Sequence, residues 1–82
     1  MLFTFTLNMA NSGGKATHNV IGDAGTSLDS FHALVSFISN NEFLVIDEFY
    51  THGEQSELRP AGEIAINCRL IGKVKTFNPQ GD

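Results

Sequence analysis

Apolar and polar residues alternate from residue 2 to residue 10, which is typical of a strand that is buried on one side. The apolar set on one face consists of Phe3, Phe5, Leu7 and Met9. Residues 11–14 are rich in asparagine and glycine, which tolerate the positive φ angles of tight turns. Residues 16–21 then read as a weaker return strand, so we expect a β-hairpin at the start of the chain.

The period of the apolar residues changes from two to about 3.6 after Thr26, which predicts an amphipathic helix over residues 27–40. The residues that recur on its apolar side are Leu28, Phe31, Leu34, Val35 and Ile38. Thr26 followed by Asp29 has the spacing of a capping box, and the asparagines at 40 and 41 suit a helix end. We expect this helix to cover another element.

Three further strands are expected in the second half of the chain. Residues 42–52 begin apolar on both faces, which predicts a long, central, bent strand with a bulge near Asp47. Residues 53–60 are expected to be a polar loop, because Pro60 cannot donate to a strand ladder. Residues 63–77 contain two β-branched runs separated by one polar turn at 67–70, an arrangement that closes small, strongly bent sheets.

This order of elements predicts a mainly β fold: a small five-stranded, strongly bent antiparallel barrel, with the amphipathic helix inserted between strands 2 and 3. Residues 1–77 are expected to form a single domain and residues 78–82 a C-terminal tail. A chain of 82 residues buries little more than about 60% of the surface that its unfolded form exposes, so its core should be thin. A partner subunit would then supply part of the missing stability.

Charge and cysteine content narrow the function classes. The formal net charge is −4, which weighs against non-specific binding to nucleic acid or anionic lipid. Three of the five basic residues, Arg69, Lys73 and Lys75, nevertheless follow one another with no acid between them. A single cysteine, Cys68, excludes an internal disulfide framework and fits a reducing compartment. The N-terminus lacks the pattern of a signal peptide and no stretch approaches transmembrane length, so we expect a cytoplasmic protein without a membrane partner.

Residues 64–74, with the long bent strand at residues 42–52, resemble the Sm-like family of small five-stranded barrels. In that family the fourth strand ends in one helical turn before the fifth begins, and Arg69 lies where the family's arginine in this turn would fall. The chain departs from the family in three places. Its helix interrupts the barrel between the second and third strands instead of preceding it, and the aspartate and asparagine that the family carries in the loop there have no counterpart. Leu70 stands where a glycine is expected. The resemblance implies an oligomeric ring built by pairing of edge strands, with single-stranded nucleic acid bound near the pore.

The candidate nucleic-acid contacts are Arg69, Lys73 and Lys75 for phosphates, with Tyr50 or Phe77 to stack a base. The alternative for the two lysines is the common role of edge-strand lysines, which prevent indiscriminate pairing of sheets. Asn67 is interpreted as a turn residue whose side chain bonds its own backbone.

Other chemistry-bearing residues have simpler interpretations. Glu48, Tyr50 and His52 share a strand face near Asp47 and Glu54 and could hold a metal or an acid/base pair, but solvated polar groups beside a loop are the alternative that the sequence favours. Residues 11–15 lack the spacing of a phosphate-binding loop, so a hairpin turn is the preferred interpretation. Cys68 is taken as a buried or inert thiol, because nothing places His18 or His32 beside it.

We therefore expect a non-enzymatic module that forms homo-oligomers through strand edges and binds single-stranded RNA or DNA, with no cofactor or metal. The alternative is a protein-interaction or structural accessory module without a nucleic-acid role. A third hypothesis, a small hydrolase or metal enzyme around Glu48 and His52, would need a concave site formed mainly between subunits.

Overall fold

The computed structural model of the chain describes residues 1–11, 14–53 and 57–78. Within these residues it contains five antiparallel strands in one sheet and one α-helix, so the chain is mainly β, as its pattern predicts. The elements are β1 (Leu2–Asn11), β2 (Gly14–Asp23), the 3₁₀ turn η1 (Thr26–Leu28), α1 (Phe31–Asn40), β3 (Phe43–His52), β4 (Glu57–Asn67), the 3₁₀ turn η2 (Cys68–Leu70) and β5 (Ile71–Thr76). The helix lies between β2 and β3 in the chain, as predicted.

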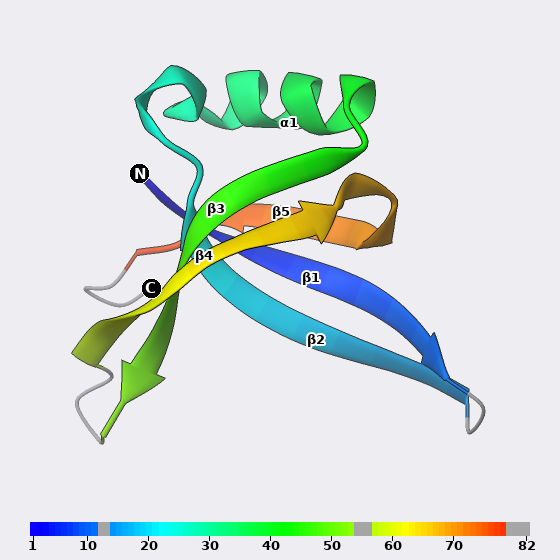
Figure 1. The fold of residues 1–82 in the computed structure, drawn as a ribbon, viewed down its shortest axis with the longest axis horizontal. Helices are drawn as coiled ribbons and strands as arrows, with labels where there is room; N and C mark the ends of the chain where they lie inside the picture. Colours follow the sequence, from blue (N-terminus) through cyan, green and yellow to red (C-terminus); the bar gives the residue numbers. More distant parts are fainter. Residues whose placement is uncertain (12–13, 54–56, 79–82) are drawn as a thin grey trace.

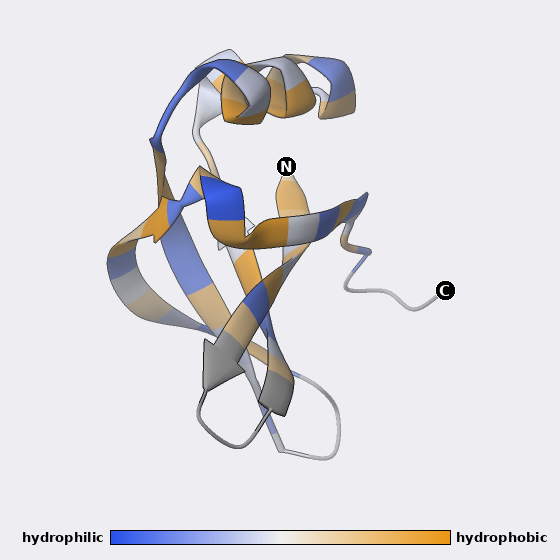
Figure 2. Cartoon of the chain, turned by 90° about the vertical axis from the view of Figure 1, so that its right-hand side faces the viewer, coloured by the Kyte–Doolittle hydropathy of each residue, from blue (hydrophilic) through white to orange (hydrophobic). Residues whose placement is uncertain are grey.

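The spatial order of the strands is β4-β3-β2-β1-β5, so β4 and β5 are the two edges of the sheet. The β1–β2 and β3–β4 hairpins pair along most of their length, whereas β2 and β3 pair only from Ile21 opposite Phe49 to Asp23 opposite Asp47. Joined over this short stretch, the two hairpins cross each other, and α1 lies above them (Figure 1). The apolar side of the helix is turned toward the strands (Figure 2).

The core fills the space between the crossed hairpins and the helix. Its fully or nearly buried members are Phe3, Phe5, Leu7, Val20, Leu34, Leu44, Ile46, Ile66 and Cys68. The predicted inward set on β1 is thus confirmed for its first three members. For Met9 the prediction of an inward position is wrong, because its side chain is 47% exposed. It lies in the part of the β1–β2 hairpin beyond the ladder with β3, where no further strand covers it.

The helix begins later than predicted. Ser30 is its N-cap residue, and the Ser30 hydroxyl accepts a hydrogen bond from the Ala33 N–H at 3.2 Å. The capping box predicted at Thr26 is therefore wrong; Thr26 opens η1 instead, and Asp29 accepts a hydrogen bond from the N-terminal amine. The α-helix starts after Ser30 because Thr26–Leu28 form the separate turn η1 on the path from β2 to the helix.

Strand β4 also differs from the prediction, because it begins at Glu57 and includes residues assigned to a loop. Pro60 lies opposite Phe49, at a register shift between Glu48 and Phe49. A proline is tolerated there because β4 is an edge strand and one of its sides makes no ladder hydrogen bonds. The irregularity lies near Asp47, as predicted, but the prediction of a bulge within residues 42–52 is wrong: Glu48 and Phe49 are opposite Gly62 and Pro60, so the extra residue is Ala61 of β4.

The turn predicted at residues 67–70 is confirmed as η2. The Asn67 side chain caps it by accepting a hydrogen bond from the Arg69 N–H at 2.9 Å, as interpreted from the sequence. No β4–β5 pairing occurs among the described strands, so the sheet is open and a closed barrel is not confirmed. The only α-helix of these residues, α1, is too short to cross a membrane.

Candidate nucleic-acid interface

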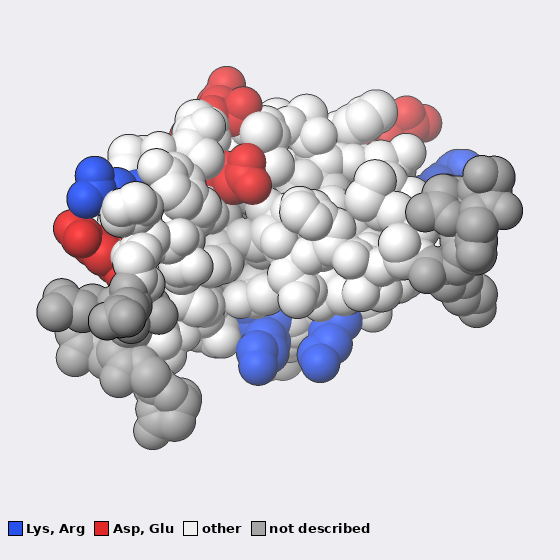
Figure 3. Space-filling model, turned by 90° about the horizontal axis from the view of Figure 1, so that it is seen from below, with Lys and Arg blue, Asp and Glu red and all other residues white. Residues whose placement is uncertain are grey.

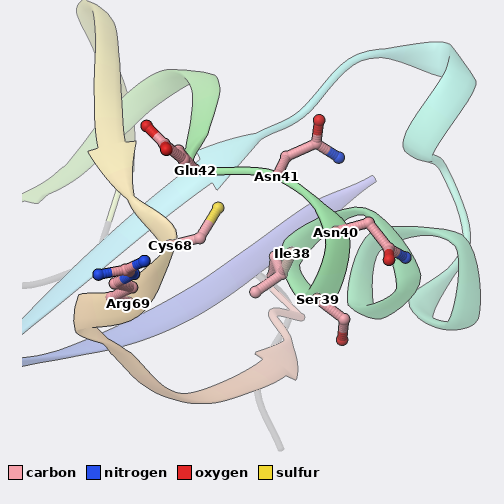
Figure 4. A pocket seen from close by; sticks show the side chains of 7 residues that line it. All are labelled: Ile38, Ser39, Asn40, Asn41, Glu42, Cys68 and Arg69. Atoms are coloured by element: carbon pink, nitrogen blue, oxygen red, sulfur yellow. The ribbon is translucent and has the colours of Figure 1, made fainter.

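A cleft of about 540 Å³ separates the end of α1 from η2. One wall consists of Ser39, Asn40 and Asn41, and the opposite wall of Cys68 and Arg69, with Glu42 between them at the approach to β3 (Figure 4). The lining is mostly polar, but its side chains do not converge: those of Glu42 and Arg69 point away from the amides of Asn40 and Asn41 (Figure 4). Arg69, predicted as a phosphate contact, is therefore the candidate residue that the structure places in a cavity.

Local hydrogen bonds hold both walls of this cleft. The Cys68 N–H donates to the Glu42 carbonyl at 2.8 Å, which ties the turn to the start of β3. On the helix side, the side-chain amides of Asn40 and Asn41 donate to the carbonyls of Ser36 and Phe37 at 2.8 and 2.9 Å. Phe37 is one of the last four residues of α1, whose carbonyls lack a partner within the helix, and Ser36 directly precedes them. The cleft is consequently built on anchored backbone.

A second depression of about 160 Å³ adjoins the first through two shared residues, Glu42 and Arg69. Its other lining residues are Phe43 and Asn67, which lie opposite each other in the β3–β4 ladder. Phe43 is 54% exposed. An exposed aromatic ring beside an arginine is the combination that stacks a base and contacts its phosphate.

Phe43 was not among the candidates from the sequence, although a signal for it existed. The start of β3 is apolar on both faces, so one apolar set had to point away from the core. The structure buries Leu44 and Ile46 and leaves Phe43 and Val45 exposed. The packing of β3 against the other hairpin and the helix decides which set faces the core, and the sequence pattern does not.

Tyr50 does not line the cleft or the second depression. It lies opposite Arg59 in the distal half of the β3–β4 hairpin, seven residues and therefore up to about 23 Å along the strand from Phe43. Its ring is 48% exposed and makes an edge contact with the His52 ring at 6.5 Å between centroids. The predicted grouping of Tyr50 with Arg69 is therefore not present within one chain.

Lys73 and Lys75 lie together on the exposed face of β5, opposite Thr6 and Thr4 of β1. Neither lysine lines the two depressions that contain Arg69. Among the described residues, Arg69 and both lysines form no ion pair. Figure 3 shows basic side chains at the lower rim of the face seen from below, with acidic side chains mostly toward the upper rim.

The remaining candidate residues show no shared site. Cys68 is 6% exposed and burial raises the pKa of its thiol, which disfavours the nucleophilic thiolate. In the stretches that the structure describes, no group of three or more His, Cys, Asp or Glu side chains could hold a metal ion. Glu54, and Ser12 and Gly13 of the predicted hairpin turn, lie outside the described residues.

Comparison of the chain with protein-family models, with curated proteins and with solved structures gives no match.

Proposed function

We propose that this chain is a non-enzymatic module that self-associates through its strand edges and binds a short segment of single-stranded RNA or DNA at Arg69. The observation that carries the proposal is the open sheet, whose two edges, β4 and β5, are joined by the short turn that holds Arg69. Edge strands present unpaired N–H and C=O groups that a strand from another chain can satisfy.

The sheet is best described under this proposal as a small, strongly bent barrel that is open along the seam between β4 and β5. Its support is the crossing of the two hairpins and the direct succession of the two edge strands (Figure 1). A core of nine buried residues, counted over the described part of the chain, is small for an independent domain. Pairing with a second copy would lengthen the sheet and cover half-buried side chains at both edges.

Nucleic acid would bind at the two adjoining depressions. The Phe43 ring offers a stacking surface, and the Arg69 guanidinium offers a charge for a phosphate. Glu42 and Asn67 supply polar groups at the base edge, as single-stranded recognition requires. Stacking of one base on an aromatic ring contributes about 1–3 kcal/mol, so a site of this size would bind short segments weakly and an assembly of several copies more tightly.

Light scattering after size-exclusion chromatography tests self-association directly: a particle of at least twice the chain mass is expected at micromolar concentration, and a strict monomer would refute it. Fluorescence anisotropy with labelled single-stranded oligonucleotides tests binding. Arg69→Gln should weaken it, whereas Arg59→Gln is the matched control, because Arg59 is an exposed arginine on β4 that lies 3.6 Å from Glu57. An Arg69, Lys73 and Lys75 triple substitution that leaves affinity and its salt slope unchanged would remove the binding proposal.

The second candidate function is a protein-interaction module without a nucleic-acid role. The net charge of −4 favours it, as does the pair of exposed apolar side chains, Phe43 and Val45, on the outer face of β3. A protein that assembles but changes the anisotropy of no oligonucleotide at low salt would support this second function over the first.

A further inference from the structure

The outer face of β3, which points away from the core, carries two apolar side chains with a carboxylate between them. Val45, Asp47 and Phe49 follow one another at every second position of this strand. They alternate with Leu44 and Ile46, which are buried in the core, so their side chains lie on the opposite face. Val45 is 51% exposed and Phe49 is half-buried.

The neighbouring strands widen each apolar position into a band. Ile21 of β2 and Pro60 of β4 lie opposite Phe49 and form one band with it. Ala65 of β4 lies opposite Val45 and forms the second band with it. A partner that covers both bands would remove exposed apolar surface from water.

Three carboxylates form a row between the two bands. Asp23, Asp47 and Glu63 occupy directly opposed positions on β2, β3 and β4, where like charges destabilise neighbouring strands. Asp23 accepts a hydrogen bond from the Gly25 N–H at 2.8 Å and lies 3.9 Å from the N-terminal amine. Among the described residues, the acidic pair of Asp47 and Glu63 has no cationic partner. A rule of strand pairing that is broken without compensation inside the chain marks a candidate functional surface.

A depression of about 240 Å³ lies at this row, beside the turn that follows β2. Its lining includes all three carboxylates together with Val45 and Gly25. A water molecule takes up about 30 Å³, so the depression holds several waters and has room for the head group of one lysine or arginine. A cation from outside the chain would relieve the repulsion within the acidic pair.

We infer that this outer face binds an extended segment of another protein, with a cationic side chain in the depression and one apolar side chain on each band. Outward residues of β3 lie about 6.6 Å apart, and so do alternate residues of an extended segment. A segment whose first, third and fifth residues are apolar, cationic and apolar therefore matches Val45, Asp47 and Phe49 position by position. Its backbone polar groups point along the sheet and remain in water, so they need no partner strand.

Charge determines the class of partner. A row of carboxylates repels a phosphate backbone and attracts a basic protein segment. None of the residues of this face lines the two depressions that contain Arg69, and strand-edge pairing lies in the plane of the sheet. The inference therefore adds a second binding surface to the proposed function and does not rest on it.

Selection of linear peptides from a phage-displayed random library on the immobilised full chain tests this inference. Enriched peptides should carry a lysine or arginine with an apolar residue two positions away on each side. The most enriched peptide is then synthesised with a fluorescent label, and its affinity is measured by anisotropy. The Asp47→Asn, Glu63→Gln double variant should bind it about tenfold or more weakly than the parent chain, and high salt should weaken binding to the parent chain.

The matched control is the Glu48→Gln, Glu57→Gln double variant. These two carboxylates belong to the same strands but lie on the other face, and their loss changes the net charge equally. This control should bind the peptide as the parent chain does. Removal of like-charge repulsion should leave the Asp47→Asn, Glu63→Gln variant at least as resistant to urea as the parent chain, so its loss of affinity is not a loss of folding.

Failure to enrich any peptide overturns the inference, and so do enriched peptides without a cation. Equal affinity of the parent chain and the Asp47→Asn, Glu63→Gln variant overturns it as well, as does an equal loss in the matched control. If the parent chain is an oligomer in light scattering and this variant is a monomer, a second copy occupies the face and the partner inferred here is wrong. An oligonucleotide whose binding is lost in this variant would assign the face to nucleic acid and would also refute the inference.

Discussion

Gly22 of β2 makes room for the Ile46 side chain of β3. A Cβ atom built at Gly22 would overlap the Ile46 Cδ1 atom and would lie 3.0 Å from Ile46 Cγ1. Gly22 lies opposite Glu48 in the short β2–β3 ladder, which is the only direct pairing between the two hairpins among the described residues. The absent side chain lets the hairpins cross closely while Ile46 remains fully buried.

Gly22→Ala is expected to destabilise the protein by about 1–3 kcal/mol, because the added methyl group overpacks a filled site. Urea unfolding followed by circular dichroism measures this loss. Ile46→Val removes the Cδ1 atom and costs about 0.5–1.5 kcal/mol alone. The double variant should lose less stability than the sum of the losses of the two single variants. Strict additivity would contradict the proposed overlap.

Asn67→Ala should lower the free energy of unfolding by about 0.5–2 kcal/mol, since it removes the acceptor for the Arg69 N–H at the start of η2. Asn67→Asp keeps that acceptor and is the matched control. The urea midpoints of the two variants provide the comparison. Equal destabilisation by both substitutions would show that the side-chain cap contributes nothing to the turn.

We expect the Cys68 thiol to make the protein less stable at alkaline pH. Burial raises its pKa above the ordinary 9.0. Below that value both folded and unfolded chains keep the proton, so the thiol adds no pH dependence. Above it, the unfolded chain releases the proton while the folded chain retains it, and stability falls until the pH passes the folded pKa.

The difference in urea midpoint between the parent chain and Cys68→Ala, measured from pH 7 to pH 10, isolates this effect. The comparison is needed because hydrogen bonding to Asp29 raises the pKa of the N-terminal amine, whose stabilising contribution is also lost as the pH rises. Iodoacetamide should label native Cys68 far more slowly than the urea-unfolded chain. Equal labelling rates would show that the thiol is accessible in the folded protein.

Phe43→Ser should weaken oligonucleotide binding by about 1–3 kcal/mol if its ring stacks a base. Tyr50→Ser is the matched control, since Tyr50 is an aromatic residue of similar exposure on the same strand but outside the cleft. Anisotropy titrations at constant salt compare the two variants. A larger loss of affinity with Tyr50→Ser would show that Tyr50, the residue predicted from the sequence, stacks the base and Phe43 does not.

The sequence predicts the elements well where local chemistry dominates. Alternation at Phe3, Phe5 and Leu7 determines a one-sided strand, and the 3.6-residue period determines that a helix follows. Asn67 marks its turn because its short side chain readily bonds the backbone two residues on. These features depend on neighbours within a few positions, so the pattern alone determines them.

The tertiary structure decides the features that join distant segments. Nothing local distinguishes Ser30 from Thr26 as the helix cap, and Pro60 is compatible with β4 only because that strand is an edge. The choice of Leu44 and Ile46 over Phe43 and Val45 for the core follows from the crossing of the hairpins. The cleft at Arg69 and the acidic pair of Asp47 and Glu63 likewise arise from contacts between elements. Sequence periodicity determines which faces exist, and only packing determines which of them meet.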